Sequence, residues 1–342
     1  MRRYAGVLAL ALVWIGTGAM VAVGQDRAPD PVAWAYGFVN SGPDPAAPPC
    51  AADTKPHDCS WPGRPWPDDG KLLRLPGSDQ SFTIGQVQSF WAPADWYPNE
   101  HPPAPDIVKF GHEKDHLRAC GHCHYFNGMG KPENAHLAGL PVNYILQQMD
   151  LFKTGGRKPA DSRKANANEM TQIARFLTDE ETKQAAEYYS TLKWRPWIKV
   201  IESATAPKTR QSPAGMFLPL DGGGTEPLGE RIIEVPQDTD RTERLRDPHS
   251  GFVAYVPVGS VAKGKEIVTG GAGKTIPCIT CHGDDLLGTG DIPPIAGRSA
   301  SYTMRQLHNF QQGTRDNAMM KAVVKKLNTD DLISIVAYLA SQ

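Results

Sequence analysis

Residues 120–130 read CGHCHYFNGMG and place two cysteines and two histidines within five consecutive positions, Cys120 to His124. Such a cluster can bind a metal ion, act as a redox-active dithiol or attach a cofactor covalently. The pattern returns at residues 278–282, which read CITCH, 158 positions further along the chain. The choice among these three chemistries therefore decides the fold and the function together.

The two motifs belong to a longer internal repeat. The pairs matched at the same spacing are Gly130 and Gly288, Ala138 and Ala296, Gly139 and Gly297, Tyr144 and Tyr302, Gln148 and Gln306, Phe152 and Phe310, Gly155 and Gly313, and Arg157 and Arg315. Beyond these pairs the spacing falls to 150, because the first copy holds eight extra residues near KPADSRKANANE. One module used twice, at residues 106–195 and 252–342, explains this pattern.

Both modules are expected to be helical. LTDEETKQAAEYY opens with Thr178 and Glu181 at capping-box spacing, and LNTDDLISIVAYL opens at Asn328 with apolar residues at helical intervals. A second helix is expected in each copy, at PVNYILQQMDLF and SASYTMRQLHNF. The modules alone therefore predict two helical domains.

The segments outside the modules are rich in residues that break helices. Residues 25–105 hold many prolines but also many tryptophans, which favours a loop-rich arm packed on the body over a disordered one. Residues 196–251 form an irregular linker, rich in proline, glycine and charge, with one strand-like run, RIIEV. The expected fold class is all-α, with two tandem helical domains, a loop-rich N-terminal arm and an irregular linker.

The spacing of the cysteines favours covalent attachment of haem. A zinc ribbon brings together two C-x-x-C pairs about 15 to 20 residues apart, and a redox dithiol belongs near a βαβ pattern. The sequence shows neither arrangement. In a C-x-x-C-H motif each thiol adds to one vinyl group of haem, and the histidine binds the iron. We predict two haem c groups, held by Cys120, Cys123, Cys278 and Cys281.

The chain resembles the two-domain, dihaem members of the class I c-type cytochromes. The residues that carry the resemblance are CGHCH, CITCH, the PPIAG run and the ending MMKAVVKKLNTDDLISIVAYLAS. It covers residues 106–195 and 252–342, roughly half of the chain, and leaves out the arm and the linker. It implies a small all-α fold around each haem, with a methionine from a loop before the last helix as the second axial ligand.

Carried over to this sequence, the resemblance implies two axial pairs, His124 with Met170 and His282 with Met320. The two methionines stand in register, each seven residues before an aligned leucine. Met319 is the rival in the second module, but it aligns with Glu169, which cannot be a corresponding ligand. The alternative to iron ligation is that each methionine packs in the hydrophobic core.

Two further histidines of the first module, His122 and His136, lie close to His124 in the sequence. His122 lies inside the C-x-x-C loop, corresponds to Thr280 and is expected to be exposed. In the family a proline carbonyl holds the proximal histidine, and the second module has Pro293-Pro294 at that place. The first module has Ala135-His136 instead, which makes the orientation of His124 less defined than that of His282.

The N-terminus predicts export. Arg2 and Arg3 precede an apolar run over residues 5–23, so residues 1–24 read as a cleaved signal or as a retained membrane anchor. A buried helix fits poorly, because the run has no polar face. The rest of the chain is expected in the periplasm, where Cys50 and Cys59 would form a structural disulfide rather than a ligand or a reactive thiol.

An iron held by histidine and methionine has both axial positions filled and changes its charge by one electron. We therefore predict an electron carrier with no catalytic residues. Its electron donor would be an exported dehydrogenase or a membrane quinol-oxidising complex, and its electron acceptor an oxidase or a small cytochrome. The alternatives are a cytochrome subunit of an exported dehydrogenase, which the large arm favours, a dihaem peroxidase and a haem-based sensor. A net charge of −1 offers no case for nucleic-acid binding.

Overall fold

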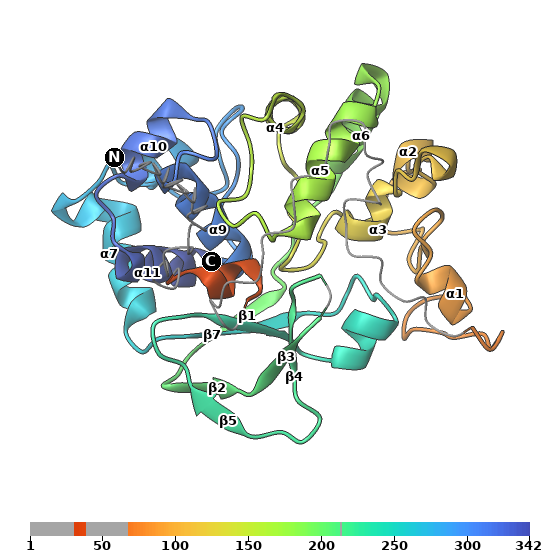
Figure 1. Ribbon diagram of the computed structural model, residues 1–342, viewed down its shortest axis with the longest axis horizontal. Coiled ribbons are helices and arrows are strands. Elements are labelled where there is room, and N and C mark those ends of the chain that lie inside the picture. Colours follow the sequence, from red (N-terminus) through yellow and green to blue (C-terminus); the bar gives the residue numbers. More distant parts are fainter. Residues whose placement is uncertain (1–30, 39–67, 213) are drawn as a thin grey trace, which may run out of the picture.

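The computed structural model describes residues 31–38, 68–212 and 214–342 (Figure 1). Cys50, Cys59 and the N-terminal apolar run lie outside these residues, so the disulfide and the export signal stay predictions. In the part of the chain that is described, no helix is long and apolar enough to cross a membrane.

The main helices fall into two groups, each with its own cluster of buried apolar side chains. The first helical group holds α2 (Asp106–Lys109), α3 (Cys120–His124), α4 (Val142–Thr154), α5 (Ala165–Phe176) and α6 (Asp179–Thr191). The second helical group holds α7 (Ser260–Gly270), α8 (Ile279–His282), α9 (Ala300–Gln311), α10 (Ala318–Val324) and α11 (Thr329–Ala340). Figure 1 shows the second group in blue beside the first group in yellow and green.

The helices expected from the sequence are confirmed, and so are their caps. The Thr178 hydroxyl accepts a hydrogen bond from the Glu181 amide at 3.2 Å, and the Glu181 carboxylate accepts one from the Thr178 amide at 2.9 Å. Asn328 and Asp331 make the same reciprocal pair at the start of α11. These bonds satisfy amides that would otherwise lack a partner in the first turn, which is why α6 and α11 begin where they do.

The expected all-α fold class is wrong, because the presumed irregular linker is built of strands. β1 (Ile198–Glu202), β7 (Phe252–Val256) and β6 (Ile233–Pro236) form one sheet in that order, with β1 parallel and β6 antiparallel to β7. Two small antiparallel pairs join β2 (Thr205–Pro207) to β5 (Thr225–Pro227) and β3 (Thr209–Gln211) to β4 (Phe217–Pro219). The fold is therefore mixed, with two helical groups above a region of sheets.

The local pattern predicted only the RIIEV strand, which overlaps β6. β1 pairs with β7 through partners such as Ile198 and Phe252, which lie far apart in the chain, and such parallel pairing leaves no local turn signal. On β7, Phe252, Ala254 and Val256 are buried while the residues between them are half-buried. Ala254 and Val256 belong to the core of the second helical group, whereas Phe252 packs with Met216 and Leu218. The sheet therefore forms part of that core.

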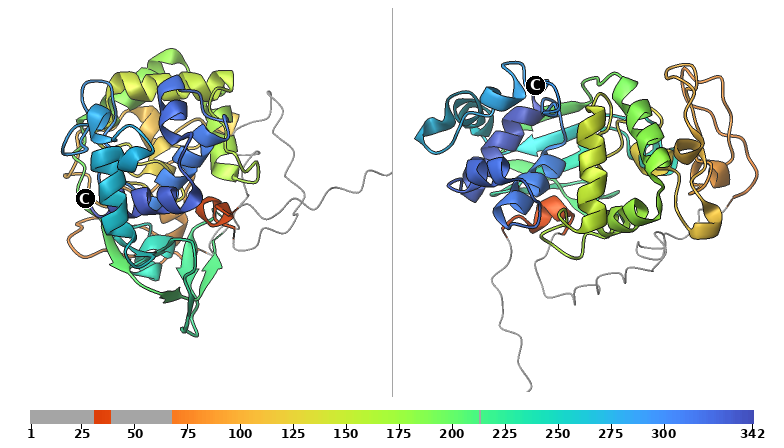
Figure 2. Two further views of the ribbon diagram at one scale, coloured as in Figure 1. Left: turned by 90° about the vertical axis from the view of Figure 1, so that its left-hand side faces the viewer. Right: turned by 90° about the horizontal axis from the view of Figure 1, so that it is seen from above.

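The two helical groups are joined directly. Lys158 donates its amide to the Thr314 carbonyl at 2.8 Å, and Asp316 donates to the Gly156 carbonyl at 2.7 Å, around an antiparallel bridge between Arg157 and Arg315. The short helix η1 (Ala33–Tyr36) packs on α9. Figure 2 shows the two groups side by side, with the arm beyond α2 and α3.

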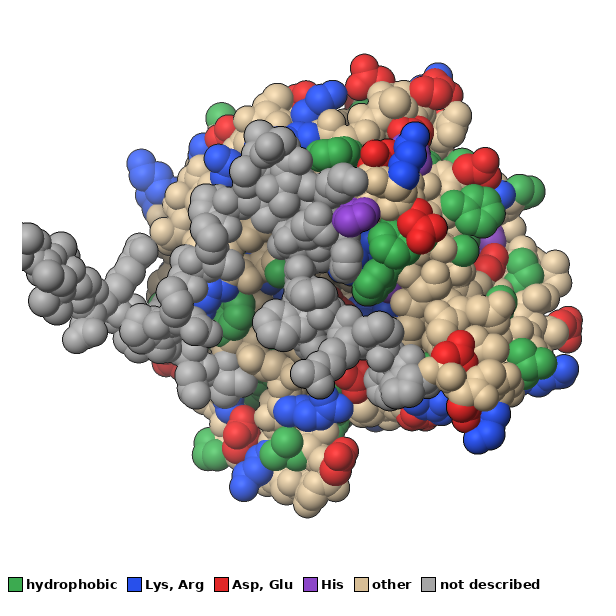
Figure 3. Space-filling view, turned by 45° about the vertical axis from the view of Figure 1, so that its right-hand side comes forward, with side chains coloured by type: hydrophobic (Ala, Val, Ile, Leu, Met, Phe, Trp, Pro, Cys, Tyr) green, Lys and Arg blue, Asp and Glu red, His purple; other side chains and the backbone are tan. Residues whose placement is uncertain are grey.

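The longer described part of the arm, residues 68–105, is mostly irregular and holds one short α-helix, α1 (Ile84–Val87). It carries its own small core, which includes the fully buried Trp96. On the face that Figure 3 presents, Lys and Arg side chains are interspersed with Asp and Glu. This face therefore lacks the single-sign charge that a polyanionic partner would require.

Candidate haem centres

The short helix α3 carries the first C-x-x-C-H motif. Cys120 and Cys123 stand one helical turn apart, and both are free thiols. Burial raises the pKa of Cys120 to about 12, and burial also raises the pKa of Cys123. A redox-active dithiol requires a lowered thiol pKa, which burial opposes at these two residues.

The second motif has the same form at α8, with Cys278 at its N-cap and Cys281 and His282 within it. Burial raises the pKa of Cys278 to about 11. Over residues 31–38, 68–212 and 214–342, no three His, Cys, Asp or Glu side chains gather closely enough to hold a metal ion. The zinc alternative therefore lacks a ligand set in this part of the chain.

The two proximal histidines are held alike. His124 Nδ1 donates to the Ala135 carbonyl at 2.8 Å, and His282 Nδ1 donates to the Pro293 carbonyl at 2.8 Å. Replacing the family's proline by Ala135 has therefore not changed this contact. Burial lowers the pKa of both rings, which favours neutral imidazoles. With Nδ1 committed to the carbonyl, Nε2 carries the lone pair that an iron requires.

The structure brings His124 and Met170 to one cavity in the first helical group. Cys123, Leu140, Ile145, Phe152 and Ile173 also line this cavity. In the second group, Met320 and Cys278 pack against the same core. Both methionines lie within helices, on α5 and α10, and not in the loops that the resemblance implied.

The first cavity is rich in buried cations. Arg157, Arg305 and Lys164 line it and are only 7%, 5% and 3% exposed. None of the three has a carboxylate within ion-pair distance among the residues described. Burial, with repulsion from Arg305, lowers the pKa of Lys164 to about 7. The buried carboxylates of Glu133 and Glu169 line the same cavity. Because an unpaired buried charge is costly, the guanidinium groups of Arg157 and Arg305 fit a ligand that brings its own anions, as haem does with its two carboxylates.

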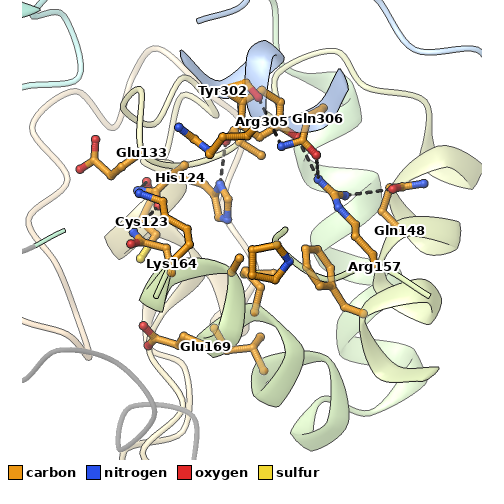
Figure 4. A pocket seen from close by; sticks show the side chains of 18 of the residues that line it. Cys123, His124, Glu133, Gln148, Arg157, Lys164, Glu169, Tyr302, Arg305 and Gln306 are labelled. Atoms are coloured by element: carbon orange, nitrogen blue, oxygen red, sulfur yellow. Dashed lines mark hydrogen bonds between the residues drawn. The ribbon is translucent and has the colours of Figure 1, made fainter. Parts of the chain in front are cut away.

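A network of repeated polar residues lies beside this cavity (Figure 4). Arg157 donates to Gln148 at 3.0 Å, to Tyr302 at 3.0 Å and to Gln306 at 3.1 Å. Arg315 mirrors it, with bonds to Gln306 at 3.1 Å, to Tyr144 at 2.8 Å and to Gln148 at 2.8 Å.

These six residues are matched pairs of the repeat, but their spacing alone indicates no role for them. The available signal was that polar residues, and not only apolar ones, recur at the repeat spacing. Their function as a shared contact between the two helical groups is visible only in three dimensions.

The expectation that His122 is exposed is wrong. The ring is only 5% exposed, and its Nδ1 donates to the Ser89 carbonyl at 2.9 Å. The residues that cover it belong to the arm, which packs on α3. The arm therefore reaches the first haem-attachment motif directly.

Comparison with known proteins agrees with this chemistry. The family model for cytochrome c matches residues 114–193. Cytochrome c-554(548) of Halomonas halodenitrificans is 33% identical over 76 residues, which cover 92% of that protein and 21% of this chain. The thiosulfate dehydrogenase electron acceptor of Thiomonas intermedia is 26% identical over 268 residues, 76% of this chain and 88% of that protein.

Among solved structures, thiosulfate dehydrogenase from Marichromatium purpuratum aligns with a TM-score of 0.46 at 24% identity. The alignment covers 69% of this chain but only 39% of that one, so this chain spans well under half of that protein. The C-x-x-C-H helices, the matched family model and the relatives together identify the cofactor and the class. The chain belongs to the cytochrome c family, as a dihaem class I member that carries electrons on covalently bound haem c.

Proposed function

We propose that each helical group is one haem domain, with bounds near 106–195 and 252–342. The first haem is attached to Cys120 and Cys123, and its iron is held by His124 and Met170. The second is attached to Cys278 and Cys281, and its iron is held by His282 and Met320. The observation that carries this proposal is the cavity shared by His124 and Met170.

The residues of this chain would tune a haem in three ways. A bound haem supplies a reversible one-electron change at its iron. The carbonyls of Ala135 and Pro293 orient the proximal rings and set their tautomer. Apolar walls such as Leu140 and Phe152 would exclude water from a bound haem, and Arg157 would compensate the charge of its carboxylates. Burial and a nearby cation both favour the reduced, less positive iron.

We further propose an exported dehydrogenase as the electron donor, with this chain as its electron-accepting partner or subunit. The relative from Thiomonas intermedia is named as such an acceptor and aligns with 76% of this chain. A small cytochrome or an oxidase would then take the electrons.

The experiment that tests this function counts haems and measures electron acceptance. We expect two haems per purified chain in an alkaline pyridine assay, and one in Cys123→Ser and in Cys281→Ser. The oxidised protein should then accept electrons from a thiosulfate dehydrogenase supplied with thiosulfate. Zinc in place of haem, a single haem, or rapid turnover of peroxide would contradict the proposal.

Export and the disulfide complete the proposal. We propose that residues 1–24 direct the chain to the periplasm and that Cys50 and Cys59 are joined there, since leftover cysteine pairs in exported proteins usually oxidise. Mass spectrometry of the native protein, alkylated without reduction, should find both cysteines unmodified by the alkylating reagent. The same spectrum shows whether the chain begins at Gln25 or keeps its apolar run.

A further inference from the structure

The arm covers the haem-attachment helix of the first helical group. Phe90 accepts a hydrogen bond from the Ala119 amide at 3.0 Å, and its ring meets the His122 ring edge-on, with centroids 4.9 Å apart. The Arg118 guanidinium lies 4.2 Å from the centre of the Phe90 ring and pairs with Glu169 at 2.9 Å. The side of α3 that faces the arm is therefore closed by protein.

The segment around the helical turn Asp240–Arg244 closes the same side further along. Arg246 donates to the His122 carbonyl, and Pro248 accepts a bond from the Asn127 side chain at 3.0 Å. This segment is tied to the arm, because Trp96 donates to the Leu245 carbonyl at 2.8 Å. Together the two segments contact Arg118, His122 and Asn127. With Met129 and Glu169, which are buried and bonded to Asn127 and Arg118, these residues form what we call the covered face.

The corresponding residues of the second helical group are exposed. By the repeat they are Ile276, Thr280, Asp285, Leu287 and Met319, which we call the open face. Ile276 is 52% exposed, Leu287 52% and Met319 68%, whereas Met129, the counterpart of Leu287, is 2% exposed. None of the residues of α8 is buried. The same side of the module is thus covered in the first helical group and exposed in the second.

The two faces also differ in the polarity of their side chains. The positions of Ile276 and Met319 correspond to Arg118 and Glu169, which contact each other as an ion pair. The open face therefore has two exposed apolar residues at the positions where the covered face has a charged pair with little exposure. Large apolar side chains gathered on a surface mark a place where another protein binds.

The loop that carries Leu287 is acidic, whereas the lysines nearest Ile276 and Met319, Lys274 and Lys321, are each paired with a carboxylate. Asp284, Asp285 and Asp291 are exposed on the same loop as Leu287, and none has an ion-pair partner among the described residues. Asp291 accepts a hydrogen bond from the Asn143 amide, and Asp285 accepts one from the Leu287 backbone. Carboxylates around an apolar centre favour a partner whose apolar surface is rimmed by lysine or arginine.

We propose that this chain accepts electrons at the open face, from a redox protein that presents an apolar surface rimmed by basic residues, and that the arm keeps such proteins off the covered face. The proposal rests on the proposed function, since it requires haem at both motifs. One electron leaves the reduced centre of the partner and reduces the iron of the second haem, with no bond made or broken. The first haem then exchanges electrons with the second.

The test uses the full-length holoprotein and, as the probe, a reduced small cytochrome with lysines around its exposed haem edge. Stopped-flow mixing at low salt measures the second-order rate of electron transfer. Leu287→Lys and Asp285→Lys should each slow it by about 10-fold or more, because charge at the rim controls association. Val258→Lys is the matched control, since Val258 is an apolar residue outside both faces that is more exposed than Leu287, at 73% against 52%.

Hydrogen exchange of the complex gives a second readout. Protection should arise at residues 276–291 and not at residues 84–92 of the arm. Equal rates for Leu287→Lys and Val258→Lys, or protection at the arm, would overturn the proposal. Its failure is distinguishable from that of the proposed function, because a haem-containing protein that a small reductant reduces normally retains that function whatever the variants show.

Discussion

Arg157 and Arg315 lie across from one another where the two helical groups meet, and each donates a hydrogen bond to the glutamine of the other group. Arg157 reaches Gln306 at 3.1 Å, and Arg315 reaches Gln148 at 2.8 Å. Both guanidinium groups are buried, and the two residues are equivalent in the repeat. The contact is therefore an approximate two-fold pair, in which neither helical group satisfies its arginine alone.

This pairing predicts that the two arginines are energetically coupled. Arg157→Leu and Arg315→Leu should each lower the free energy of unfolding by about 2 to 3 kcal/mol, because each leaves buried polar groups unsatisfied. The double variant should differ from the sum of the single variants by about 1 kcal/mol or more, since the two share both glutamine acceptors. Denaturant unfolding of the holoprotein measures all three values.

Arg210→Leu provides the control for that cycle. Arg210 makes an exposed ion pair with Glu243, far from the shared glutamines in sequence. Combined with Arg157→Leu, its small effect should simply add. An additive result for Arg157 and Arg315 themselves would mean that the two halves of the network act independently.

The packing of α7 on α11 predicts opposite effects for two glycines of α7. A Cβ on Gly264 would lie far inside van der Waals distance of the Ser334 carbonyl oxygen, whereas one on Gly270 would meet nothing within 4 Å. Gly264→Ala should therefore lower the free energy of unfolding by about 2 kcal/mol or more. Gly270→Ala should leave it unchanged or raise it by up to about 1 kcal/mol, since alanine restricts the unfolded chain. Thermal unfolding should show a lower midpoint for Gly264→Ala and an unchanged or higher midpoint for Gly270→Ala. Equal destabilisation of both variants would refute the close helix contact.

Asp331 predicts a loss of stability in acid. Its buried carboxylate accepts hydrogen bonds from Lys274 at 2.7 Å and from the Asn328 amide at 3.1 Å. Burial by itself would raise the pKa of Asp331, but these bonds outweigh it and hold the pKa below its usual value. A lowered folded pKa means that the stabilisation is complete above about pH 4 and is lost as the pH falls through the folded value.

Asp331→Asn should accordingly be about 1 to 3 kcal/mol less stable than the wild type at neutral pH. The difference should shrink as the pH falls below about 4. Asp330→Asn is the matched control, since its neighbouring carboxylate is 66% exposed and pairs with Lys263 at the surface, so it should cost under about 1 kcal/mol. Urea unfolding from neutral to acidic pH measures both, and a constant deficit for Asp331→Asn would exclude the titration.

The features that the sequence revealed are those set by neighbours in the chain. The attachment chemistry requires Cys120, Cys123 and His124 at a local spacing, and the helix caps at Thr178 and Asn328 are likewise local. The repeat also singled out Met170, which lines one cavity with His124.

The features that the sequence did not reveal depend on distant contacts. His122 is hydrogen-bonded to Ser89, 33 residues earlier in the chain. No sequence pattern in the arm predicted this contact. The fold class was wrong because β1 finds its parallel partner in β7, across the whole presumed linker. Short strands of three residues, such as β2 and β3, carry too few residues for an alternating pattern to stand out.

The most direct test of the account is the optical spectrum of the oxidised protein, compared with Met170→Ala and Met320→Ala. Ferric haem with a sulfur ligand shows a weak charge-transfer band in the far red, which disappears when the sulfur–iron bond is lost. We predict that each substitution removes about half of this band while both haems stay attached, which identifies two His/Met irons. A wild-type band that one substitution abolishes entirely, or that neither changes, would contradict the assignment of a relay built from two equivalent carriers.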